Sequence, residues 1–270
     1  MSLPRLAGLL GVSVFLVAAP LAATAEAGFM SGWQGYTFAQ FPGTSSPLHV
    51  NYAVWERSSE PNGNVDWAQE IQTELGVTGF KSAVRPLSDY NPDAKYVYFY
   101  SVHDLGALSD QQDLDYFQLP LVKIDDDRAG HVDNFLFQYD GNAVPGEHGT
   151  LVGGDPAKLS FVGDTQGSAL EPSASILGSV AHFSWTGFNT SDPNVTYSSV
   201  FFVASDTEPL WGSAVLEGTF TGNVQRVGFA YVPLAFTPEP SSLLLMCAAF
   251  AGAACVRFGR RRKWNPLPRA

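Results

Sequence analysis

Residues 95–102 read KYVYFYSV, a run dominated by aromatic and β-branched side chains. Such side chains are enriched in strands, because they pack well on a pleated, half-buried surface. Upstream, residues 48–55 (LHVNYAVW) alternate with a period of two, which places successive side chains on opposite faces of a strand. The same composition recurs downstream and predicts further strands at residues 135–139, 180–185, 196–204, 215–221 and 224–232.

Turn-forming residues separate these runs, and Thr221-Gly222-Asn223 between two strong strands predicts a hairpin. One helix is predicted from Asp66 to Leu75, with Trp67, Ile71 and Leu75 on its apolar face. The predicted fold is all-β, a β-sandwich of roughly eight to twelve strands, for which a jelly roll is one arrangement. A signal helix is expected before this domain and a hydrophobic helix after it.

The chain has 270 residues, of which 45% are hydrophobic and 13% aromatic, so it can build a core. Residues 28–236 carry 8 Lys and Arg against 24 Asp and Glu, a net charge of −16. Such a surface repels nucleic acid and anionic lipid and attracts cations or basic partners. Both cysteines, Cys247 and Cys255, lie near the C-terminus, so this domain folds without disulfides.

The first 27 residues are typical of a secretory signal peptide. Arg5 supplies the positive charge, and the apolar run of residues 6–19 ends at Pro20. Ala25 and Ala27 fit the small-residue pattern of a cleavage site, which predicts cleavage before residue 28. A retained membrane anchor is the alternative, but the apolar run is short for a span of about 20 residues. We therefore assign residues 1–27 to the signal and residues 28–236 to the exported domain.

The C-terminal segment combines three parts in a fixed order. Residues 237–240 read TPEP, and Leu243–Val256 (LLLMCAAFAGAACV) contains no charge. Fourteen apolar residues are marginal for a permanent span of about 20, which favours a temporary anchor. A basic cluster follows and is expected to stay on the cytoplasmic side. It consists of Arg260, Arg261, Arg262 and Lys263.

Pro238-Glu239-Pro240, the apolar stretch and the basic cluster together resemble the PEP-CTERM sorting signal, over residues 237–264. The resemblance implies recognition by exosortase, an integral membrane cysteine transpeptidase, with cleavage near Pro-Glu-Pro. It also implies a temporary anchor facing the periplasm, later release to the outer surface or medium, and a host that makes exopolysaccharide. Residues 265–270 form a short cytoplasmic end, whereas family members usually stop soon after the arginines. An ordinary single-span anchor is the alternative.

Asp125, Asp127 and Asp133 form a candidate calcium site, because calcium prefers several hard oxygen ligands. The run does not fit an EF-hand, since Ala129 stands at the fifth loop position. A solvated acidic loop is the alternative.

His131 and Asp133 are two residues apart, so both point to one face of a strand and can begin a metal site. No third ligand can be named from the sequence, and no other cofactor is expected.

No motif in the sequence assigns a catalytic residue: H-E-x-x-H, G-x-S-x-G, the P-loop and G-x-G-x-x-G do not occur. Five tryptophans can form a sugar-stacking platform, although tryptophans at strand positions are more often core. They are Trp33, Trp55, Trp67, Trp185 and Trp211.

The expected function is that of an exported surface or matrix protein, not an enzyme, associated with exopolysaccharide and not with nucleic acid. The alternatives are a secreted hydrolase acting on polysaccharide and a permanently anchored periplasmic binding protein.

Overall fold

Strand β4 (Tyr96–Asp104) holds most of the KYVYFYSV run and lies inside a six-stranded antiparallel sheet. The computed structural model describes residues 27–39, 41, 48–58, 65–86, 88–104, 112–121, 127–138, 159–164, 169–186, 188, 197–220 and 224–235. The signal peptide up to Glu26 and all of the C-terminal segment lie outside these ranges, so the two expected flanking helices do too. Within the described ranges no helix has the length and apolar character needed to cross a bilayer.

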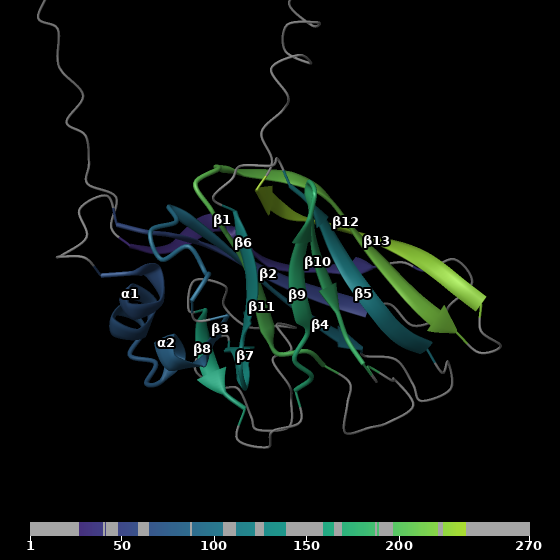
Figure 1. Ribbon diagram of the computed structural model, residues 1–270, viewed down its shortest axis with the longest axis horizontal. Coiled ribbons are helices and arrows are strands. Elements are labelled where there is room, and N and C mark those ends of the chain that lie inside the picture. Colours follow the sequence, from purple (N-terminus) through teal and green to yellow (C-terminus); the bar gives the residue numbers. More distant parts are fainter. Residues whose placement is uncertain are drawn as a thin grey trace, which may run out of the picture.

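Two large antiparallel sheets and a small two-stranded sheet make up the described strands (Figure 1). The first sheet runs in the order β1 (Gly28–Ala39), β2 (Leu48–Glu56), β4, β11 (Val200–Ser205), β6 (Arg128–Val132) and β3 (Val84–Arg85). The second runs in the order β13 (Val224–Ala235), β12 (Pro209–Phe220), β5 (Gln112–Pro120), β10 (Val180–Ser184) and β9 (Ser173–Leu177). The small sheet pairs β7 (Phe135–Gln138) with β8 (Ser160–Gly163).

The two large sheets pack face to face over one hydrophobic core. Tyr98 and Phe201 contribute to it from the first sheet, and Phe117, Phe183 and Leu216 contribute from the second. Side chains alternate along a strand, and the opposite face of the first sheet carries Val97, Phe99 and Phe202, so that face must be covered as well. The all-β class is confirmed, and the shared core makes the two sheets a sandwich.

A second core covers the opposite face of the first sheet. Phe99 and Phe202 contact Trp67 of helix α1 (Trp67–Glu74), with ring centroids 5.9 and 5.1 Å from the indole. Helix α2 (Phe80–Ala83) and strand β8 add Phe80 and Phe161. Figure 1 shows α1, α2, β7 and β8 together on the side away from β12 and β13. The KYVYFYSV strand is therefore buried on both faces.

Helix α1 forms where the sequence predicts it. Asp66 is its N-cap, and one carboxylate oxygen accepts a 2.7 Å hydrogen bond from the backbone N–H of Gln69. The helix ends at Glu74, with Leu75 as its C-cap, and Trp67 and Ile71 are fully buried. Helix α2 is not predicted, because four residues are too few to show a helical period.

The predicted strands match β2, β4, β7, β10, β11, β12 and β13, with shifted ends. The predicted hairpin is confirmed, because β12 and β13 pair from Phe220↔Val224 onward. Strands β1, β3, β5, β6, β8 and β9 are not predicted from the sequence. They are short, acidic or glycine-rich, and pairing with neighbouring strands fixes them in place.

The two large sheets come together along two seams at or next to their edges. Strand β1 lies against β13 on one side, and β6 lies against β9 on the other. Residues from distant parts of the chain come together at both seams, and both carry side chains of functional interest.

Gly130 shows how tightly β6 is packed, and replacing it by alanine is expected to cost about 2–3 kcal/mol of unfolding free energy. A Cβ there would overlap the carbonyl oxygen of Arg85 and lie 2.6 Å from Cζ of Phe202. Urea denaturation of the purified protein measures the loss. Gly163→Ala in β8 is the matched control, because its Cβ meets nothing within 4 Å. Equal stability of the two variants would contradict the packing described here.

Candidate functional site

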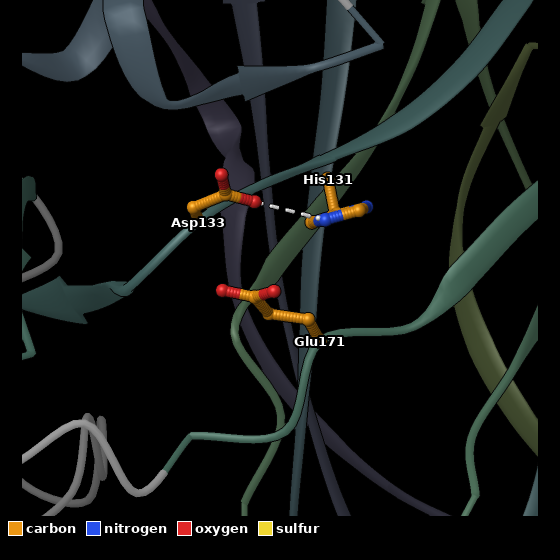
Figure 2. Close-up of side chains that lie close together, drawn as sticks. All are labelled: His131, Asp133 and Glu171. Carbon is orange, nitrogen blue, oxygen red and sulfur yellow. Dashed lines mark ion pairs between the residues drawn. The ribbon is translucent and has the colours of Figure 1, made fainter.

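Three potential metal ligands converge at the β6–β9 seam. His131 belongs to β6, Asp133 follows that strand directly, and Glu171 stands two residues before β9. Nε2 of His131 lies 3.0 Å from Oδ1 of Asp133. One ligand atom from each of the three residues lies within 4.8 Å of the others. Figure 2 shows the imidazole and both carboxylates turned toward one another, with Glu171 approaching from a different segment.

Backbone pairing fixes the β6 side of this cluster. Arg85 of β3 pairs in register with His131, so their side chains are cross-strand neighbours. The backbone N–H of Asp133 donates a 2.9 Å hydrogen bond to the carbonyl of Ala83. The Arg85 guanidinium then reaches Asp133, with Nε 2.8 Å from Oδ2. Asp133 Oδ1 is therefore the oxygen directed at the imidazole.

Two backbone hydrogen bonds of Leu170, the residue before Glu171, hold the Glu171 side of the cluster in place. The backbone N–H of Leu170 donates to the carbonyl of Tyr197 at 3.0 Å, and the carbonyl of Leu170 accepts a hydrogen bond from the backbone N–H of Ser199 at 2.9 Å. These bonds tie the segment before β9 to the segment before β11, and β11 pairs with β6. The backbone of Glu171 is thus held next to β6, while its side chain is exposed.

Burial lowers the pKa of His131 from its ordinary value of 6.5. The charges of Asp133 and Glu171 oppose this shift, and the charge of Arg85 adds to it. The lowered pKa favours the neutral imidazole near pH 7, the form that binds metal ions through a ring nitrogen. With His131 neutral, the two carboxylates and the guanidinium leave the group with a net charge of about −1.

The structure does not bring the candidate calcium ligands together. Asp127 is buried just before β6, and Asp133 follows the same strand. Six residues of extended chain span about 20 Å, too far for two carboxylates to share one ion at 2.3–2.6 Å. Asp125 lies outside the described residues, so its part in the prediction stays untested.

The His131–Asp133 pair does converge as the strand period predicts. Glu171 stands 38 positions after Asp133 in the chain, and no sequence pattern near it indicates that it joins the pair.

An aromatic group occupies the opposite seam, where β1 lies against β13, and it includes Trp211 of β12 and Tyr52 of β2. The rings of Trp33 and Trp211 stack with centroids 5.1 Å apart, and Trp211 and Tyr231 stack at 5.5 Å. Tyr52 meets Trp211 edge-on at 5.4 Å. Trp33 lies in β1 at a break in register between Phe29 and Gln34, the kind of bulge that redirects a side chain.

The aromatic group continues as an exposed row along β13. Phe229 and Tyr231 are 59% and 58% exposed, and Val227 is 40% exposed. Their neighbours Ala230 and Val232 point into the core between the sheets. The strand period therefore separates one buried face from one solvent-facing apolar face. We call Trp33, Trp211, Phe229 and Tyr231 the aromatic surface.

The tryptophans divide between core and surface. Trp55 and Trp67 are fully buried, and Trp185 is 7% exposed. Trp33 and Trp211 belong to the aromatic surface, with Trp211 39% exposed. The sequence could not separate these two groups, because all five stand in strand-like or helical contexts of similar composition.

The signal and sorting residues fall largely outside the described ranges. Ala25 and the sorting residues Pro238, Glu239, Pro240 and Arg260–Lys263 are not described. Ala27 packs against the second core, and β1 begins at Gly28, where cleavage is predicted.

Comparisons with known proteins bear on the C-terminal segment. A family model described as the PEP-CTERM protein-sorting motif matches residues 236–263. No curated protein and no solved structure matches the chain at a significant level. The matched range contains Pro238-Glu239-Pro240 and the whole basic cluster. The chain therefore carries a PEP-CTERM sorting motif, which supports an exported protein that exosortase processes at the membrane and that then reaches the cell surface.

Proposed function

We propose that the exported domain is a non-enzymatic module of the cell surface that binds a neutral polysaccharide through its aromatic surface. The observation that supports this proposal is the row of exposed rings on β13 next to the Trp33–Trp211–Tyr231 stacks. Exposed apolar patches of this kind mark binding sites, because their exposure to water is otherwise unfavourable. Sugar rings have apolar faces that pack flat against aromatic rings.

The stacking holds the aromatic surface in one arrangement before a ligand binds. The planes of Trp33 and Trp211 differ by 18°, and those of Trp211 and Tyr231 by 16°. Rings that are already fixed lose little conformational entropy on binding. Phe229 lies two residues before Tyr231 on the same strand face, about 7 Å away. A linear polymer can therefore contact both rings.

The charge of the domain favours a neutral ligand. Residues 28–236 carry three times as many acidic as basic residues. A surface of that sign repels uronate-rich or sulfated polysaccharides over roughly a Debye length. A neutral polymer avoids this repulsion.

A binding role also agrees with the contacts that Asp133 makes beside Glu171 at the β6–β9 seam. Asp133 and Glu171 approach each other as the two carboxylates of a glycoside hydrolase do. However, Asp133 Oδ2 contacts the Arg85 guanidinium and Oδ1 contacts the His131 imidazole, an arrangement that does not suit the protonated general acid of such a pair. Release of reducing ends from a bound polysaccharide would favour the hydrolase instead.

Tyr231→Ala is expected to weaken binding to neutral polysaccharide at least about tenfold, as loss of a central aromatic contact typically does. Affinity electrophoresis of the purified protein in gels containing neutral or anionic polysaccharides measures the change. Tyr36→Ala is the matched control, because Tyr36 is also an exposed tyrosine, on β1, and its ring packs against His49 and Phe38. Equal retardation of the wild type, Tyr231→Ala and Tyr36→Ala in every gel would refute the proposal.

A further inference from the structure

We propose that His131, Asp133 and Glu171 bind one divalent transition-metal ion, of which Zn²⁺ is the best fit, across the β6–β9 seam. This site lies away from the aromatic surface and does not depend on the proposed polysaccharide binding. The ion would join the first sheet, through β6, to the edge strand of the second sheet, β9.

The ligand set favours a transition metal over calcium. One imidazole nitrogen and two carboxylate oxygens suit Zn²⁺, which binds nitrogen and oxygen at about 2.0–2.2 Å. Calcium prefers six to eight oxygens, and an imidazole is a poor ligand for it. Three protein ligands leave at least one coordination position for water, as in the open zinc sites of many proteins.

The spacing of the ligand atoms is close to what such an ion requires. Two ligands of a tetrahedral zinc ion lie about 3.3 Å apart, and Nε2 of His131 is 3.0 Å from Oδ1 of Asp133. The remaining ligand atoms lie within 4.8 Å. Since the Glu171 side chain is exposed, a change of rotamer can bring its carboxylate closer without moving the backbone.

Arg85 orients the Asp133 carboxylate for this role. Its Nε holds Oδ2 at 2.8 Å, which leaves Oδ1 to the metal. Partners of this kind fix the direction of a ligand without touching the ion. The two carboxylates of the cluster favour a cation, as does the acidic character of the whole domain.

Calorimetric titration of the full chain in detergent, stripped of metal with a chelator, tests the site. We expect one equivalent of Zn²⁺ to bind, Mn²⁺ to bind more weakly and Ca²⁺ not to compete. Glu171→Gln is expected to weaken Zn²⁺ binding at least tenfold. It is the decisive variant because an exposed side chain can be changed without loss of the fold. Glu208→Gln is the matched control, because Glu208 is also exposed and lies just before β12.

Thermal unfolding gives a second measurement. Zn²⁺ at about 100 times its Kd is expected to raise the Tm by roughly 5–10 °C in wild type and in Glu208→Gln. The rise is expected to be much smaller in Glu171→Gln at the same concentration. Absence of Zn²⁺ binding in wild type would overturn the proposal, and so would Glu171→Gln binding Zn²⁺ as tightly as wild type.

Discussion

Phe201→Ala is expected to lower the free energy of unfolding by about 4 kcal/mol, the largest stability effect of any single change proposed for this protein. Phe201 is fully buried in β11, at the centre of the core between the two large sheets. Its ring lies 4.5 Å from Phe183, 5.2 Å from Phe117 and 5.6 Å from Trp185, measured between centroids. Removing it leaves a cavity that rings from both sheets cannot fill without moving.

Phe229→Ala is the matched control, because it makes the same chemical change on an exposed ring. Its effect on stability is expected to stay within about 0.5 kcal/mol. Chemical denaturation of both variants, with the urea midpoint and slope compared, measures the difference. Similar losses in the two proteins would mean that Phe201 does not lie at the centre of the sandwich core.

Deletion of residues 236–270 is expected to abolish C-terminal processing altogether. This segment contains the matched sorting motif, with both Pro238-Glu239-Pro240 and the basic cluster. Without the apolar stretch and the basic cluster, the exported chain loses the segment that keeps it in the membrane for exosortase. The truncated protein should therefore cross the membrane and appear in the soluble periplasmic fraction. Fractionation followed by immunoblotting measures its distribution.

A milder variant separates recognition from anchoring. Replacing Pro238, Glu239 and Pro240 by alanine keeps the apolar stretch and the basic cluster, so the chain should stay in the membrane unprocessed. Mass spectrometry of the mature wild-type protein should show a C-terminus that lacks Arg260–Lys263. An intact cluster in the mature protein would instead indicate a permanent membrane anchor.

The strands that the sequence predicts are those whose own residues carry the signal. KYVYFYSV is rich enough in aromatic and β-branched residues to be a strand in any context. By contrast, β6 (RAGHV) contains a charged residue and a glycine, and only its pairing with β11 and β3 makes it a strand. Strand β5 is acidic and reads as a loop until β10 and β12 pair with it.

The candidate sites show the same division. The strand period brings His131 and Asp133 to one face, so the sequence suffices for that pair. Glu171 joins them only because β9 lies against β6. The aromatic surface likewise requires β1 to lie against β13, the partner of β12, which places Trp33 of β1 on Trp211 of β12. Composition could not show which tryptophans would be exposed.

The sequence by itself determined the all-β class, the helix after Asp66, the hairpin after Phe220 and the sorting motif, because each depends on residues close together in the chain. Tertiary structure alone decided which strand edges meet, which rings are exposed and which third ligand joins His131 and Asp133. Those outcomes depend on contacts between segments far apart in the chain. No local pattern encodes such contacts, because they form only when the two sheets close over a common core.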